Sequence, residues 1–271
     1  KGAIFGNHFA GSYHGEVFND FVNNTAYGDY SHAEGTYATA YASSSHAEGN
    51  STFTYGESSH AEGTANITYG AISHAEGGFN VTCGEGSHVE GGVNITYGEV
   101  SHAEGTNNTT YGSASHVEGY ENTTYGVYSH AEGHGTTTNG EYSHAEGILS
   151  IAYGAASHAE GGGNVAYTEG SHAEGSANIT YGMCSHAEGF LNKTYGDFSH
   201  VEGTENIAYN TYSHAEGIGN ISYGSYSHVE GTQNITYGMC SHAEGTYNIA
   251  YTSYSHAEGE YTNASSKGTQ S

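Results

Sequence analysis

The sequence predicts an all-β protein, a single parallel β-solenoid built from 14-residue coils with two strands each. Three observations predict this fold: a pentapeptide that recurs every 14 residues, an alternation of small and large side chains, and a glycine that closes each half-repeat. Alternation with a period of two is typical of strands, and glycine is typical of tight turns. We therefore place residues 24–259 in one solenoid of about 17 coils.

The pentapeptide Ser-His-(Ala or Val)-Glu-Gly first begins at Ser31 and last at Ser255, and every step is 14 residues without insertion or deletion. Between its copies lies a second motif, Asn-Ile-Thr-Tyr-Gly, which is clearest at residues 66–70 and 234–238. Each half has five alternating residues and two variable ones, so we expect one strand and one turn from each half. We expect the glycine that ends each half to take a positive φ in its turn.

The segments that flank the repeat depart from its pattern. Residues 1–23 contain Phe5, Phe9, Phe18 and Phe21 and are expected to form an N-terminal cap. A cap would cover a strand edge that otherwise invites pairing with another chain. Residues 260–271 are expected to form a polar C-terminal tail. The sequence starts at Lys1, which fits an exported chain whose signal segment has been removed.

Side-chain size predicts which residues face the interior. Two short strands that close on each other leave a narrow lumen, and only compact side chains fit there. We therefore expect the Ser, Ala, Asn and Thr columns to point inward, with their polar atoms bonded along the stack. The His, Glu, Ile and Tyr columns are then expected to point outward.

The outward Tyr and Ile columns are the predicted assembly face. A soluble monomer rarely exposes a large continuous apolar surface, and Tyr serves partly wet contacts well. The alternative is that the Tyr column only stabilises the sheet through stacking between neighbouring strands. The residues predicted for this face are Tyr69, Tyr97, Tyr111, Tyr125, Tyr181, Tyr195, Tyr209, Tyr223, Tyr237, Ile67, Ile95, Ile179 and Ile235.

The His and Glu columns form a predicted charged face, represented by His74, Glu76, His102, Glu104, His186 and Glu188. Glutamates ~4.8 Å apart on neighbouring strands repel each other in water by just under ~1 kcal/mol per pair. Protonated histidines, bound cations or a partner surface would offset this repulsion. We expect raised histidine pKa values and firmer assembly as the pH falls towards ~6. Weakly bound divalent cations are the other open interpretation, and no further cofactor is expected.

The repeat S-H-A-E-G-x-x-N-I-T-Y-G-x-x resembles the 14-residue head repeat of trimeric autotransporter adhesins, and the resemblance covers about residues 31–259. It implies a left-handed parallel β-roll, an extracellular location and often a trimer. The half-repeat is also similar to the repeat of grass ice-binding β-rolls. One difference is that the outward face of adhesin heads is aliphatic towards the trimer axis, whereas here one face carries His and Glu.

Composition excludes several classes of function. The formal net charge is -26, with 3 Lys plus Arg, so nucleic acid is not an expected partner. The sequence has no apolar run long enough for membrane insertion. Enzymatic activity is not expected either, because the repeat offers no unique nucleophile and no insertion that would form a pocket.

The three cysteines are candidates for disulfides between chains. Cys184 and Cys240 occupy the same position of the repeat but lie four coils apart, ~19 Å, which exceeds disulfide reach. Cys83 takes the place of a Tyr on another face. The candidate glycosylation sites are Asn23, Asn50, Asn107 and Asn263, whereas the sequons at Asn66, Asn94, Asn122, Asn178 and Asn234 are expected to face inward.

These features favour an extracellular structural protein of the cell surface or envelope. Its partners would be copies of itself, with rods that assemble laterally into a fibre, sheath or surface layer. One alternative is the head module of a trimeric adhesin or phage fibre. A second is an ice-binding protein, which would need an outward row of Thr.

Overall fold

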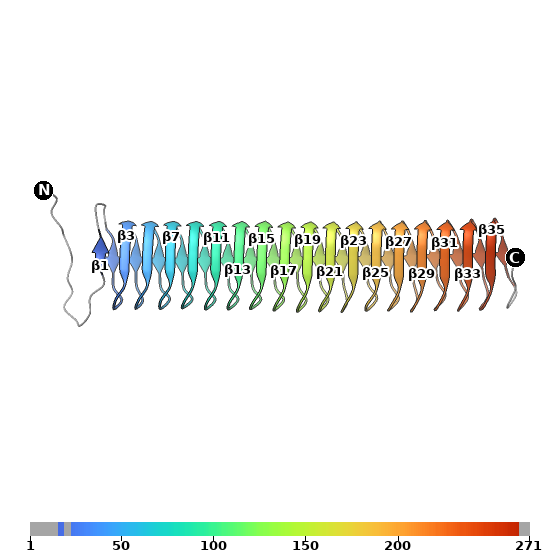
Figure 1. Cartoon of the computed structure of the whole chain (residues 1–271), viewed down its shortest axis with the longest axis horizontal. Coiled ribbons are helices and arrows are strands. Elements are labelled where there is room, and N and C mark those ends of the chain that lie inside the picture. Colours follow the sequence, from blue (N-terminus) through green and yellow to red (C-terminus); the bar gives the residue numbers. More distant parts are fainter. Residues whose placement is uncertain (1–15, 19–22, 266–271) are drawn as a thin grey trace. The chain divides into compact units, whose positions relative to one another are not determined.

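A computed structural model describes residues 16–18 and 23–265, in which all regular structure is β-strand. These residues fall into two compact units that divide between Gly135 and Thr136. In each unit the chain winds as a parallel β-solenoid of 14-residue coils, with one long and one short strand per coil (Figure 1). The predicted fold class is confirmed. The described residues contain no helix capable of crossing a membrane.

The long strands all begin at the histidine of the pentapeptide. In the first unit they are β3 (His32–Thr36), β5 (His46–Asn50), β7 (His60–Thr64), β9 (His74–Gly78), β11 (His88–Gly92), β13 (His102–Thr106), β15 (His116–Tyr120) and β17 (His130–His134). In the second unit they are β19 (His144–Ile148), β21 (His158–Gly162), β23 (His172–Ser176), β25 (His186–Phe190), β27 (His200–Thr204), β29 (His214–Ile218), β31 (His228–Thr232), β33 (His242–Thr246) and β35 (His256–Glu260).

The short strands contain two residues each and come from the second half of the repeat. In the first unit they are β2 (Thr25–Ala26), β4 (Thr39–Ala40), β6 (Phe53–Thr54), β8 (Ile67–Thr68), β10 (Val81–Thr82), β12 (Ile95–Thr96), β14 (Thr109–Thr110) and β16 (Thr123–Thr124). In the second unit they are β18 (Thr137–Thr138), β20 (Ile151–Ala152), β22 (Val165–Ala166), β24 (Ile179–Thr180), β26 (Lys193–Thr194), β28 (Ile207–Ala208), β30 (Ile221–Ser222), β32 (Ile235–Thr236), β34 (Ile249–Ala250) and β36 (Asn263–Ala264).

Strand pairing places equivalent residues of successive coils next to each other. In the pair β13–β15, His102 lies against His116 and Glu104 against Glu118. The same parallel register holds in the second unit, for example between β21 and β23. Each outward residue type therefore forms a column within its unit.

The interior contains only compact side chains, as predicted. The Ser, Ala or Val, Asn and Thr columns are buried, and the largest fully buried side chains are valines and asparagines. Val89, Ala103, Val117 and Ala131 form one apolar cluster of the first unit. Beside this cluster, Ser101 Oγ donates to the carbonyl of Gly98 at 2.7 Å, and Thr110 Oγ1 donates to Ser101 Oγ at 3.0 Å.

The buried asparagines form a hydrogen-bonded ladder from coil to coil. Asn94 Oδ1 accepts the backbone N–H of Asn108 at 2.8 Å. Asn94 Nδ2 donates to the carbonyls of Glu90 at 2.7 Å and Gly105 at 2.8 Å. Because the asparagine side chain takes the backbone N–H of the next coil, the backbone ladder is interrupted there. This explains why the second strand is shorter than the five residues that its alternation predicts.

The two glycines of the repeat are needed for different reasons. Gly105, which ends the first half of a coil, has the predicted positive φ of 98°. Gly98, which ends the second half, does not have a positive φ. A Cβ atom at Gly98 would lie 2.0 Å from the carbonyl oxygen of Gly112. The prediction of a positive φ is wrong for this second glycine, which instead allows close approach of neighbouring coils. The left-handed conformation falls on the second variable residue, such as Val100 with φ 53°.

The ends of the solenoid differ in part from the expected boundaries. β1 (Glu16–Phe18), which lies in the expected cap, pairs in parallel with β3. The rest of that cap, residues 1–15 and 19–22, lies outside the described residues. At the other end, β36 extends the repeat structure beyond Gly259 to Ala264, and only residues 266–271 of the expected tail lie outside the description.

The asparagine ladder makes a prediction for stability. Asn94→Ala removes the acceptor of a buried N–H and the donor to two carbonyls, so we expect the free energy of unfolding to fall by about 2–3 kcal/mol. Urea denaturation followed by far-UV circular dichroism measures the change. The control Thr106→Ala, at an exposed position, should change it by less than about 0.5 kcal/mol. Equal effects of the two substitutions would contradict this role of the ladder.

Candidate functional site

In each unit the predicted assembly residues lie on the face formed by the short strands. In the first unit the rings of Tyr97, Tyr111 and Tyr125 stack with centroids 5.0 and 4.9 Å apart and interplanar angles of 6° and 1°. In the second unit the same column runs from Tyr153 to Tyr251 through stacked neighbours. Most of these tyrosines are exposed, and the isoleucines beside them are half-buried. Stacking and exposure coexist, so the column both stabilises the sheet and presents an aromatic surface.

This tyrosine face carries no carboxylate. From Thr25 to Tyr251 its outward positions hold Tyr, Ile, Val, Thr, Phe, Cys, Asn and one cation, Lys193. The glutamates of the pentapeptide lie on the long strands instead. The other carboxylates nearest to the tyrosine face are in the turns that border it, two residues after the Tyr position, as at Glu57, Glu99 and Glu169.

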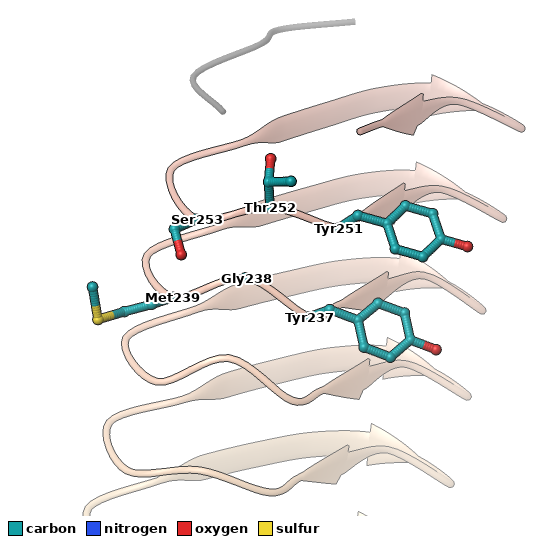
Figure 2. A pocket seen from close by; sticks show the side chains of 6 residues that line it. All are labelled: Tyr237, Gly238, Met239, Tyr251, Thr252 and Ser253. Atoms are coloured by element: carbon teal, nitrogen blue, oxygen red, sulfur yellow. The ribbon is translucent and has the colours of Figure 1, made fainter. Parts of the chain in front are cut away.

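A shallow groove crosses the tyrosine face in the second unit. It has a volume of 490 Å³ and is lined by Tyr237, Gly238, Met239, Tyr251, Thr252 and Ser253. Figure 2 shows the two tyrosine side chains extending to the same side from successive coils. Their ring centroids are 5.3 Å apart, with an interplanar angle of 8°. The groove is a gap between neighbouring repeats, and the lining contains no acid, base or thiol.

The histidines form a second column, on the face of the long strands. The rings of His60 and His74 stack with centroids 4.8 Å apart and an interplanar angle of 3°. The spacing stays between 4.6 and 5.0 Å along each unit, although some pairs are tilted. The Nε2 atoms of His60, His74 and His88 are buried and have no hydrogen-bond partner.

Burial within the stack lowers the pKa values of several column histidines. Burial lowers the pKa of His60, and the adjacent His46 and His74 lower it further, against the opposing effect of Glu62 and Glu76. The pKa is lowered, with burial as the main cause, for His46, His74, His102, His158, His186, His214 and His242, and for His214 to about 4. The expectation of raised histidine pKa values is therefore wrong. Each ring is enclosed by its neighbours, and their mutual repulsion adds to the cost of charging it.

Many of the column histidines face the glutamate two residues later. The Nε2 to Oε2 distance is 3.9 Å between His46 and Glu48 and 3.7 Å between His158 and Glu160. With the histidine of the next coil these pairs make imidazole–carboxylate triads, whose ligand atoms lie within 4.8 Å of one another. Three such triads are His46/Glu48/His60, His116/Glu118/His130 and His158/Glu160/His172. Imidazole nitrogen and carboxylate oxygen are ligands that first-row transition ions accept.

The cysteines and the candidate glycosylation sites lie at separate places. Cys184 and Cys240 are exposed at corners, whereas Cys83 is half-buried on the tyrosine face, and none of the three is in a disulfide within the described chain. Burial raises the pKa of Cys83. The candidate sites Asn23, Asn50, Asn107 and Asn263 are exposed. The five sequon asparagines expected inside, from Asn66 to Asn234, are fully buried.

The corners carry exposed apolar side chains that the sequence analysis did not single out. Ile72, Val100 and Leu149 are each more than 60% exposed and occupy the left-handed position of a turn. The residue type at this position changes from coil to coil, so no periodic signal marks it. The one signal in the sequence that could have identified this position is its constant location, directly before the Ser or Asn of each half-repeat.

In comparisons with known proteins, no family model and no curated protein matches the chain.

The lowered histidine pKa values predict that acid destabilises the fold. Between pH 6.5 and about 4 the unfolded chain binds more protons than the folded chain, so the free energy of unfolding falls as the pH falls through this window. We expect a lower melting temperature at pH 5 than at pH 7.5. The variant His158→Gln/His214→Gln should lose less over the same interval, because two of the responsible groups are gone. A melting temperature that rises on acidification would contradict the prediction.

Proposed function

We propose that this protein is an extracellular structural protein whose solenoids assemble laterally with copies of themselves into a fibre, sheath or surface layer. The observation that supports this most directly is the exposed tyrosine column on a face without carboxylates. A soluble chain gains free energy when such a surface is covered, by about 25 cal/mol for each Å² of apolar area removed from water. The extracellular location rests on the resemblance to adhesin heads.

Charge favours a second copy of this chain as the occupant of the tyrosine face. With a formal net charge of -26, two copies repel each other wherever their glutamates meet. On the tyrosine face they can approach through the Tyr and Ile columns, where carboxylates occur only in the bordering turns. The equal spacing of the stacked rings also matches the spacing on another copy, so two such columns can lie side by side in register.

The inward orientation of the threonines disfavours ice binding. Thr68, Thr96 and Thr180 are fully buried, and outward threonines of the short strands, such as Thr109 and Thr123, occur in only some of the coils. An adhesin or phage-fibre head remains the alternative that the resemblance suggests, and it predicts discrete trimers.

Charged substitutions on the tyrosine face test the proposed assembly. Tyr181→Glu/Tyr209→Glu places carboxylates within the Tyr column, which has none, and is expected to abolish assemblies seen by sedimentation velocity and negative-stain microscopy. The matched control Leu149→Glu/Tyr247→Glu adds the same charge at exposed corners, where Glu205 shows that glutamate is accepted. The control should assemble like the wild type.

Two outcomes would overturn the proposal. One is a wild-type chain that stays monomeric or forms only discrete trimers under conditions that keep it folded. The other is loss of assembly in the corner variant but not in the tyrosine variant, which would move the contact to the corners.

The exposed cysteines predict covalent links within such an assembly. Oxidation should give disulfide-linked dimers and larger species on non-reducing gels, and Cys184→Ser/Cys240→Ser should abolish them. Cys83→Ser is the control and should leave them intact, because burial keeps that thiol less accessible and its pKa raised. Linked species that persist in the double variant would contradict this assignment.

A further inference from the structure

The histidine column combines ligands and distances that suit a transition-metal ion. In the His46/Glu48/His60 triad the two nitrogens and one carboxylate oxygen come from adjacent strands and lie within 4.8 Å of one another. Two ligands bound to one tetrahedral zinc ion at ~2.0–2.1 Å are ~3.4 Å apart. The His46 Nε2 to Glu48 Oε2 distance of 3.9 Å would have to shorten by ~0.5 Å when an ion binds. The ring of His60, which is parallel to that of His46, must tilt for its lone pair to converge on the same ion, and ring tilts of up to 90° occur along the column.

The same nitrogens lack other bonding partners. The Nε2 atoms of His46, His60, His158 and His172 are buried without a hydrogen-bond partner, although a buried polar atom is normally satisfied. The distance of 3.9 Å to the carboxylate is too long for a direct hydrogen bond. A coordinated ion would use the lone pairs that the stacked rings leave unused.

Sharing of histidines limits how many ions the column can hold. His46 belongs to the His32/Glu34/His46 triad as well as to the His46/Glu48/His60 triad. One Nε2 has a single lone pair, so both triads cannot be filled at once. Occupied triads must therefore use separate pairs of histidines, with one ion for every two coils.

We propose that the histidine column binds divalent first-row transition ions, with Zn²⁺ as the probe. Each ion is held by His and Glu of one coil and His of the next, on separate pairs of coils. The eight column histidines of the first unit then hold four ions and the nine of the second unit hold four. Each ion also places two positive charges beside a column of glutamates that the chain's few cations cannot neutralise. This site does not depend on the proposed lateral assembly.

Stoichiometry is the first measurement. The full chain is equilibrated with excess ZnCl₂ at pH 7.5, desalted, and its zinc measured by plasma mass spectrometry. We expect about eight zinc ions per chain, and MgCl₂ in place of ZnCl₂ should leave almost none, because Mg²⁺ prefers oxygen ligands.

Two variants with equal numbers of His→Gln substitutions distinguish shared from separate sites. The alternating variant replaces His46, His74, His102 and His130, which leaves no adjacent histidines in the first unit. The contiguous variant replaces His60, His74, His88 and His102, which leaves one adjacent pair on each side of the gap. Bound zinc should fall from about eight ions to about four in the alternating variant, but only to about six in the contiguous one.

The possible results of these measurements separate shared triads from independent His–Glu sites. A larger loss of zinc in the alternating variant, with unchanged far-UV circular dichroism, supports triads that share histidines. Retention of no zinc by the wild type, or equal retention of Mg²⁺ and Zn²⁺, overturns the proposal. Equal losses in the two variants, from a wild-type value near one ion per coil, also overturn it, since each His–Glu pair would then bind alone. His134→Gln, outside the column, should leave the zinc content unchanged.

Discussion

The narrow lumen is the constraint on which the rest of this structure depends. Two strands that close on each other within 14 residues leave room for Ser, Ala, Val, Asn and Thr and for little else. Such side chains bury little apolar area, so polar contacts must contribute a large part of the cohesion between coils. The asparagine ladder meets this need, since each buried amide bonds to the backbone of its own coil and of its neighbours. Repetition without insertion follows, because one missing residue would break the ladder.

The same constraint explains why the large side chains are outside. A residue of the size of Tyr or His has no place in the lumen, so these residues form outward columns at the spacing of the strands. The two columns differ in their surroundings. The tyrosines lie on a face without carboxylates and stay exposed at their edges, whereas the histidines enclose one another and hold a glutamate nearby. One face therefore suits contact with another protein surface, and the other suits a small cation.

Much of the fold follows from the sequence, because period and side-chain size are properties of the sequence itself. They predict the coil length, the parallel columns and the inward position of residues such as Asn94 and Ala103. Properties that arise only from contact between coils are harder to predict. The short second strand depends on an asparagine side chain replacing a backbone acceptor. The second glycine is needed because Gly98 approaches the backbone of Gly112. The pKa of His60 falls because burial and the neighbouring rings disfavour its charged form, which a count of neighbouring glutamates does not reveal.

The left-handed corners have a consequence for how such a chain can diversify. The second variable residue of a turn is Val in one coil, Cys in another and Glu, Gln, Tyr or Leu elsewhere, all with a φ near 50–60°. Each turn tolerates substitution of this residue without a change in the lumen. The side chain of one coil can therefore be replaced without disturbing the next coil. The turns therefore offer equivalent attachment positions at a regular spacing. Cys184 and Cys240 already occupy two of them and could carry a label or a tether.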